Sequence, residues 1–198
     1  MLRKIVYPHI EGLLNRTAGF LNTKGITPDQ LTLGGLALNF IAGWAYLAGL
    51  LPLGGLLLLA AGLGDMLDGP LARVSGKASR FGAFLDSFVD RYSDFFVFGG
   101  LTAYFAVTAQ MGFFFLSMGT IAGAFATSYA KARAENFIAS CSVGVFERPE
   151  RLILLALGTL FTGLLGLCLW VLFFGTNITA LQRVFFTRDK LQSEPAEH

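Results

Sequence analysis

The sequence predicts an all-α polytopic membrane protein with six transmembrane helices and an amphipathic helix at the N-terminus. Of its 198 residues, 54% are hydrophobic and 14% are charged, whereas a soluble domain carries about a quarter charged residues. This charge is too sparse to cover the surface of a water-soluble protein of this size, which argues against a soluble globular fold. The net charge of +2 does not by itself bear on nucleic-acid binding, and no nucleic-acid partner is predicted.

Residues 1–26 form the first predicted segment, a helix that lies along the inner membrane surface. Apolar residues recur there at helical spacing with basic residues mixed among them. This pattern is typical of an interfacial amphipathic helix and unlike the continuous apolar core of a signal peptide. Thr27 and Pro28 then supply an N-cap and a first helical position. The membrane domain is therefore predicted to begin at residue 27.

Three long stretches without a charged residue predict the six membrane helices: residues 30–64, 95–130 and 152–182. One membrane helix uses about 20 residues, so each stretch fits a hairpin of two helices, and the third leaves only about 15 residues for each helix. Gly and Pro residues, together with Gln110 in the second stretch, mark a turn near each centre, at 52–55, 110–112 and 163–166.

The charged blocks between these hairpins then all lie on one face of the membrane, with all 15 Lys and Arg residues. The positive-inside rule makes this face the cytoplasm. We therefore expect a multi-pass protein of the inner cell membrane with its site facing the cytoplasm. The membrane domain covers residues 27–190 and a polar tail covers 191–198. A single span in the third stretch would instead place the tail outside, against the charge rule.

Five of the 13 acidic residues lie on either side of a short basic connection. They are Asp65, Asp68, Asp86, Asp90 and Asp94. Spacings of three and four place each set on one face of its helix. Carboxylates at membrane depth are costly and are expected to face a polar cavity with partners. Two antiparallel helices can aim both sets at one point, where oxygen ligands suit Mg²⁺ or Mn²⁺.

Small residues and one arginine beside the aspartates indicate a site for a phosphorylated ligand. Gly69, Ala72 and Gly82 leave the helix surface bare, so a bulky ligand can approach the backbone. Arg73 adds a cation suited to holding a phosphate. A metal cluster beside a phosphate clamp at the membrane face indicates phosphoryl-group chemistry on a lipid. The alternative from another class is an ion or proton transporter, because intramembrane acidic residues also line such pathways.

Eight positions of this region form the pattern Asp65-x2-Asp68-Gly69-x2-Ala72-Arg73-x8-Gly82-x3-Asp86-x3-Asp90. This pattern resembles the complete signature of the CDP-alcohol phosphotransferases, or CDP-alcohol phosphatidyltransferases. The resemblance implies a homodimer in which an acceptor hydroxyl displaces CMP from CDP-diacylglycerol or a close analogue.

The resemblance also implies a role for each matched residue. Asp90 would be the catalytic general base. The metal ion, Mg²⁺ or Mn²⁺, would lie among Asp65, Asp68, Asp86 and Asp90. The CDP-lipid would contact Gly69, Ala72, Arg73 and Gly82 together with Asp65 and Asp68. Asp94 is left outside the catalytic set.

The acceptor is predicted from other segments of the inner face. The strings at 128–135 and 146–151 are similar to segments of prokaryotic phosphatidylinositol-phosphate synthases, and Gln182-Arg183 resembles a pair in that group. The resemblance implies a soluble phosphorylated polyol, with inositol 1-phosphate favoured. Its phosphate would be bound by Lys131, Arg133, Arg148 and Arg183. Phosphatidylglycerophosphate synthases are the chief alternative, since glycerol 3-phosphate is also a phosphorylated polyol, and other acceptors remain open.

Overall fold

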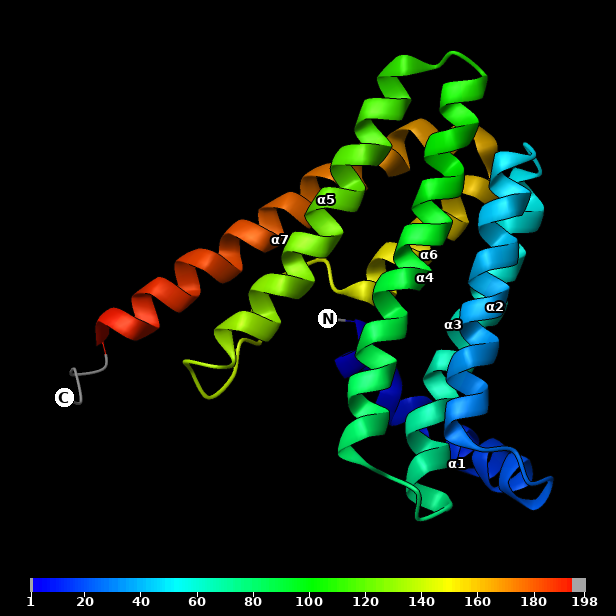
Figure 1. Ribbon diagram of the computed structural model, residues 1–198, viewed down its shortest axis with the longest axis vertical. Coiled ribbons are helices and arrows are strands. Elements are labelled where there is room, and N and C mark those ends of the chain that lie inside the picture. The colour runs from blue at the N-terminus through cyan, green and yellow to red at the C-terminus, as the bar shows by residue number, and fades with distance from the viewer. Residues whose placement is uncertain (1, 194–198) are drawn as a thin grey trace.

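Seven α-helices and one short 3₁₀-helix make up the computed structural model (Figure 1). The structure describes residues 2–193, with side chains from residue 10 onward, and this part contains no strand. The all-α prediction is thereby confirmed. The elements in chain order are α1 (Leu2–Thr23), α2 (Pro28–Leu47), α3 (Leu51–Val74), α4 (Arg80–Val107), α5 (Met111–Ala134), α6 (Arg148–Leu160), η1 (Thr162–Leu164) and α7 (Leu165–Ser193).

The N-terminal segment is helical, and α1 packs on α3 at the foot of the α2–α4 group (Figure 1). The start of α2 is the predicted one. Thr27 Oγ1 accepts a hydrogen bond from the Gln30 backbone N–H, and Gln30 Oε1 accepts one from the Thr27 N–H. This reciprocal pair satisfies donors that the first helical turn leaves open. Pro28 follows in the first turn, where its missing N–H costs nothing.

The first hairpin turn lies earlier in the chain than the Gly and Pro pattern predicts, and the other two overlap their predicted positions. The helices are interrupted at 48–50, 108–110 and 161–164. The predicted turn at 52–55 was therefore misplaced, whereas those at 110–112 and 163–166 begin two residues too late. Gly49 has a φ of 77°, a left-handed conformation that glycine adopts without strain, and the first reversal occurs there. Pro52 instead lies in the first turn of α3, a position that favours proline.

The third hairpin is unequal, which corrects the expectation of two helices of about 15 residues. α6 has 13 residues and α7 has 29. The reason is that α7 continues through charged sequence beyond residue 182, where Lys and Arg side chains can extend their charged ends away from the apolar helix surface. The first part of the predicted polar tail, to Ser193, therefore belongs to α7. Residues 194–198 of that tail lie outside the described residues.

Three segments are long and apolar enough to cross a membrane by length and composition: Leu51–Val74, Met111–Ala134 and Thr162–Ser193. Each presents large apolar side chains outward. Leu63 is 64% exposed, Phe115 is 65% exposed and Leu167 is 65% exposed. Large exposed apolar side chains in apolar helices of this length suit a surface that lipid covers. The chain is a membrane protein.

The helices form two groups that α6 and the packing of α4 on α5 join. α2 packs on both α3 and α4, whereas α5 and α7 form a second pair whose later halves diverge from α4 (Figure 1). α6 packs on both α3 and α7. The principal core includes Tyr46, Leu58, Phe98, Leu155 and Leu169, contributed by five helices. Tyr46 also shares a hydrogen bond of 3.1 Å with Thr159, which ties α2 to α6.

Close contact between α2 and α4 depends on two glycines. A Cβ on Gly100 would overlap the backbone carbonyl of Gly43, whereas one on neighbouring Gly99 would meet nothing within 4 Å. Small residues of this kind let membrane helices approach backbone to backbone.

We expect Gly100→Ala to destabilise the protein by about 1–3 kcal/mol, because the added methyl must push α2 and α4 apart. Thermal unfolding of the purified protein in detergent measures the effect. Gly99→Ala adds the same methyl to open space and serves as the matched control. Equal unfolding temperatures for the two variants would contradict the packing argument.

Candidate active site

The predicted aspartates lie on two adjacent helical segments that the short 75–79 connection joins. Asp65 and Asp68 belong to the second half of α3, and Asp86 and Asp90 belong to the first half of α4. All four are partly buried. Asp86 is close enough to Asp68 and to Asp90 for the like charges to repel, and Asp65 repels the same two carboxylates. The four carboxylates thus share one small region between α3 and α4.

Helix α2 supports the two aspartates of α3. Thr32 donates a hydrogen bond of 3.3 Å to Asp68 Oδ2. Gly35 lies one turn further along α2, and a Cβ there would come within 2.8 Å of Asp65 Oδ1. The absence of a side chain at this position therefore leaves room for the Asp65 carboxylate. Neither α2 residue was singled out from the sequence, because both contacts depend on how α2 packs against α3.

Arg148, the first residue of α6, lies in the middle of the carboxylate cluster. Its Nη1 donates a hydrogen bond of 2.5 Å to Asp65 Oδ2 and lies 2.6 Å from Asp90 Oδ1. Its Nε donates to Asp94 Oδ1 at 3.3 Å. One guanidinium thereby joins α3, α4 and α6. Charge-assisted hydrogen bonds of this kind are about twice as strong as neutral ones.

Asp94 and Arg151 form a buried ion pair behind this contact. Arg151 Nη2 donates to Asp94 Oδ2 at 2.8 Å, and each side chain is 2% exposed. Asp94 therefore accepts from two arginines, Arg148 and Arg151. The sequence analysis left Asp94 outside the catalytic set and did not include Arg151 among the residues predicted to bind the acceptor phosphate. The one feature of the sequence that indicated a role for Asp94 was its spacing, four residues after Asp90 on the same helix face.

A divalent ion would need several of these carboxylates arranged around one point. Among residues 2–193, no three His, Cys, Asp or Glu side chains are arranged so that they could hold a metal ion. The Arg148 guanidinium lies between Asp65 and Asp90, so a cation already takes the position on which these carboxylates converge. Carboxylate oxygens are the donor type that Mg²⁺ and Mn²⁺ prefer. The chemistry of these donors fits such an ion, whereas their arrangement around Arg148 does not form a metal site in this structure. The metal-ligand assignment stays a prediction.

The residues predicted to contact a CDP-lipid lie beside the aspartates. Gly69, Ala72 and Arg73 belong to the last turns of α3, and Gly82 belongs to the first turn of α4. The Arg73 guanidinium lies along α3, with Nη1 3.7 Å from the Cβ position of Gly69. Gly82 donates its backbone N–H to the N-cap residue Ser79. A helix surface without bulky side chains, with the long Arg73 side chain beside it, can accommodate a diphosphate.

The basic residues predicted to bind the acceptor phosphate differ in burial and in their present partners. Lys131 and Arg133 lie in the last turn of α5, and Arg133 is exposed and stacks over the Phe137 ring at 4.6 Å. Arg183 is buried in α7 and donates to the backbone carbonyls of Val143 and Thr127. Two of its nitrogens therefore hold the 135–147 loop and α5 in place.

The remaining nitrogen links Arg183 to the region of Arg148. Arg183 Nη2 lies 3.9 Å from Glu147 Oε1, next to Arg148 in the chain, and its charge is close enough to Arg151 for the two to repel.

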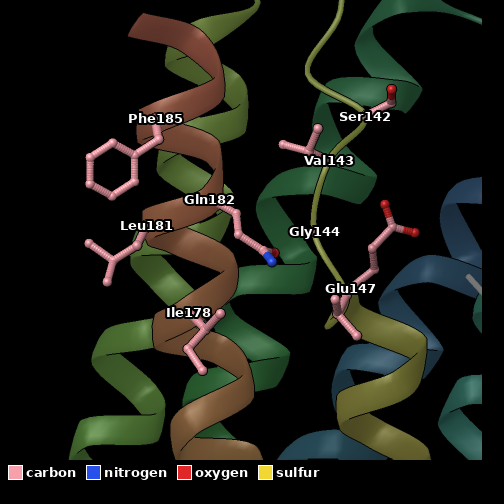
Figure 2. Close-up of a pocket in the computed structure, with 9 residues that line it drawn as sticks. Ser142, Val143, Gly144, Glu147, Ile178, Leu181, Gln182 and Phe185 are labelled. Atoms are coloured by element: carbon pink, nitrogen blue, oxygen red, sulfur yellow. The ribbon is translucent and has the colours of Figure 1, made fainter. Parts of the chain in front are cut away.

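A cavity of about 730 Å³ lies beside this region, between residues 142–147 and α7. Figure 2 shows Gln182 pointing from α7 towards the loop at Gly144, and Leu181 and Phe185, which also line the cavity, projecting from a different side of α7. Glu147 also lines the cavity, and the four signature aspartates do not. The cavity therefore does not enclose the carboxylate cluster. It lies next to the cluster, because Glu147 lines the cavity and the following residue, Arg148, contacts the aspartates.

Carboxylates of α3 and α4 that face the Arg148 guanidinium form the candidate site of this helical membrane protein. Residues 25–187 match the family model described as CDP-alcohol phosphatidyltransferase. The chain belongs to this family of membrane transferases, and the alternative of an ion transporter is set aside.

Named relatives and solved structures show which members of this family the chain resembles. The chain is 34% identical to the archaetidylinositol phosphate synthase of Pyrococcus horikoshii, over 97% of this chain and 99% of that one. It is 34% identical to the phosphatidylinositol phosphate synthase of Streptomyces avermitilis, over 95% of this chain and 83% of that one. The crystal structure of the Mycobacterium tuberculosis phosphatidylinositol phosphate synthase with CDP-DAG bound matches with a TM-score of 0.81 and 32% identity, over 88% of this chain and 92% of that one. The same enzyme in complex with manganese and citrate matches with a TM-score of 0.82 and 31% identity, over 88% of both chains.

We expect Asp94→Asn to destabilise the protein by about 3–5 kcal/mol, because it leaves the buried Arg151 charge without its partner. Unfolding in detergent measures the loss. Asp189→Asn is the matched control, since Asp189 pairs with Arg188 at the surface, where both side chains are more than 60% exposed. A stability of Asp94→Asn equal to that of the control would show that the buried pair contributes nothing.

Proposed function

We propose that this chain transfers a phosphatidyl group from CDP-diacylglycerol, or a close lipid analogue, to inositol 1-phosphate and releases CMP. The observation that carries the proposal is the convergence of four signature carboxylates beside Gly69, Arg73 and Gly82, in a chain of the CDP-alcohol phosphatidyltransferase family. The M. tuberculosis relative with CDP-DAG bound supports the lipid donor.

The relatives support the acceptor more strongly than they support the lipid. One is named for an archaetidyl lipid and the other for a phosphatidyl lipid, yet both names specify inositol phosphate. An acceptor with its own phosphate requires cations, and four are proposed for it: Lys131, Arg133, Arg148 and Arg183. Arg183 would contribute through Nη2, because its other nitrogens already donate to backbone carbonyls.

A divalent cation is proposed to bind among Asp65, Asp68, Asp86 and Asp90, which the manganese complex of the M. tuberculosis relative supports. When bound, Mg²⁺ or Mn²⁺ would withdraw charge from the diphosphate and stabilise the phosphate of departing CMP.

The remaining chemistry belongs to the chain's own residues. Arg73 would hold the diphosphate beside the bare surface at Gly69. Asp90 would accept the proton of the attacking acceptor hydroxyl as the new oxygen–phosphorus bond forms and the bond to CMP breaks. Arg148, which contacts Asp90 in this structure, would hold the acceptor's phosphate near that base.

The membrane arrangement proposed for this chemistry has six spans, α2 to α7, with α1 lying on the inner surface of the cytoplasmic membrane. α6 has 13 residues, or roughly 20 Å of helix, which is shorter than the hydrocarbon core of about 30 Å. The 161–164 connection would complete this span. The site would face the cytoplasm, where the basic residues lie.

We also propose a homodimer. An exposed aromatic row on α4, formed by Phe81, Phe84, Phe88 and Tyr92, offers apolar surface for a second copy or for lipid.

The function is tested by following CMP release from CDP-diacylglycerol by the purified protein in detergent with Mg²⁺. Inositol 1-phosphate, glycerol 3-phosphate, free inositol and serine are offered as separate acceptors. We expect inositol 1-phosphate to give the highest kcat/KM. Preference for glycerol 3-phosphate would reassign the acceptor, and use of only free inositol or serine would overturn the phosphate-binding role of the four cations.

Asp90→Asn is expected to lower the rate of CMP release by about 10²–10⁴-fold, the range for loss of a general base. Binding of CDP-diacylglycerol, measured separately by equilibrium titration, should remain. Asp189→Asn serves as an exposed control of the same chemistry. An Asp90→Asn variant that releases CMP at the wild-type rate would remove Asp90 from the base role.

A further inference from the structure

The Arg148 side chain contacts three carboxylates, which come from two helices. Nη1 contacts Asp65 of α3 and Asp90 of α4, and Nε contacts Asp94 of α4. Asp65 and Asp90 are two of the four residues proposed to bind a divalent cation. The guanidinium therefore uses carboxylate oxygens that the metal site also needs.

We propose that Arg148 and a divalent cation compete for Asp65 and Asp90, and that Arg148 leaves these two carboxylates when the cation binds. The released guanidinium then binds the phosphate of the soluble acceptor. This inference rests on the function proposed above, because it links the metal site and the acceptor site through one side chain. Its consequence is that metal binding raises the affinity for the acceptor.

Charge and geometry make the two occupants exclusive. Asp65 Oδ2 and Asp90 Oδ1 both lie within 2.6 Å of Arg148 Nη1, so these oxygens face the guanidinium. A divalent cation bound to the same oxygens would lie next to a positive charge in a mostly buried site, where repulsion is poorly screened. Conversely, carboxylates without any cation would repel one another. Arg148 resolves that repulsion in the metal-free protein.

The position of Arg148 allows it to move without unfolding a helix. It is the first residue of α6 and follows residues 135–147, which form no helix after the turn that ends α5. Asp94 holds Nε independently of the other two carboxylates. Loss of the Nη1 contacts would therefore leave the guanidinium tethered in the site.

One nitrogen of Arg148 is already available for a ligand. Nη2 is buried and has no hydrogen-bond partner among the described residues. A buried donor without an acceptor costs free energy, which a phosphate oxygen would recover. Nη2 and the released Nη1 together present the paired donors that bind a phosphate in bidentate fashion.

Two neighbouring arginines lack this arrangement and provide comparisons. Arg91 Nη1 lies 3.7 Å from Asp90 Oδ2, on α4 itself. Arg151 pairs with Asp94, also on α4. Arg148, in contrast, contacts carboxylates of both α3 and α4. The competition is assigned to it for this reason.

Metal affinity without substrate provides the first test. Free Mn²⁺ is measured by electron paramagnetic resonance during titration of the purified protein in detergent. We expect Arg148→Gln to bind Mn²⁺ about tenfold more tightly than wild type, because a competing cation is gone, which lies within the usual range of coupling between sites. Arg91→Gln removes a positive charge beside the same Asp90 without removing a bridge, so it should change the affinity less than Arg148→Gln. Equal effects of the two variants would overturn the competition and leave only a general charge effect.

Arginine labelling of the wild-type protein provides a test that needs no variant. Phenylglyoxal adducts are located by peptide mass spectrometry with and without Mn²⁺, again without substrate. We expect adduct formation at Arg148 to rise several-fold on addition of Mn²⁺ and that at exposed Arg133 to stay constant. Inorganic phosphate added together with Mn²⁺ should suppress the Arg148 adduct again. An Arg148 adduct that is unchanged or lowered by Mn²⁺ alone would show that the guanidinium does not leave the carboxylates.

These tests separate the inference from the proposed function. If the acceptor panel releases CMP as expected but Arg148→Gln and Arg91→Gln bind Mn²⁺ alike, the competition fails and the activity stands. If no CMP is released but Arg148 is displaced by Mn²⁺, the proposed reaction fails and the competition stands. Arg148→Lys keeps the positive charge with a single ammonium, and its Mn²⁺ affinity should fall between those of wild type and Arg148→Gln.

Discussion

The guanidinium of Arg148 connects three helices whose residues are distant in the sequence, and the arrangement of the site depends on this contact. Asp65 lies on α3, Asp90 and Asp94 lie on α4, and Arg148 begins α6. Several carboxylates in a partly buried region would otherwise separate or take up protons. Because Arg148 contacts carboxylates of both helices, its positive charge offsets their repulsion, and the first residue of α6 lies beside α3 and α4.

The rest of the structure supplies a firm frame around this polar region. The apolar core of Tyr46, Phe98, Leu155 and their neighbours joins α2, α4 and α6. Gly43 and Gly100 bring α2 and α4 together, and Asp94 fixes both Arg148 and Arg151. On the other side, Arg183 holds the 135–147 loop to α5 and α7 through backbone carbonyls. The side chains expected to contact substrate therefore project from elements whose positions are set by contacts elsewhere.

The parts of this structure that local patterns determine could be predicted from the sequence. The all-helical class follows from sparse charge, and the α2 start follows from the Thr27, Pro28 and Gln30 cap. The grouping of the aspartates follows from spacings of three and four along two helices. The turn positions were harder to predict from the sequence. Gly49 forms the first turn, but nearby Gly and Pro residues look equally suited to a turn, because a helix also accepts Pro in its first turn.

The partners of the aspartates could not be predicted, because they come from distant segments. Asp94 and Arg151 are 57 positions apart in the sequence, and Asp65 and Arg148 are 83 apart. Only the return of α6 towards α3 brings them together. For the same reason Arg183 was expected to face a ligand, whereas two of its nitrogens bind carbonyls of the chain. Residue type indicates which charges need partners, but the packing of the helices selects them.

The central claim is that carboxylates of α3 and α4 jointly bind one divalent cation beside the CDP-lipid site. Anomalous X-ray diffraction from crystals of the protein soaked in Mn²⁺ tests this claim most directly. The account predicts a peak bounded by the carboxylates of Asp65, Asp68, Asp86 and Asp90, with the Arg148 side chain turned away from Asp65. A peak elsewhere, or Mn²⁺ bound while Arg148 still bridges Asp65 and Asp90, would contradict it.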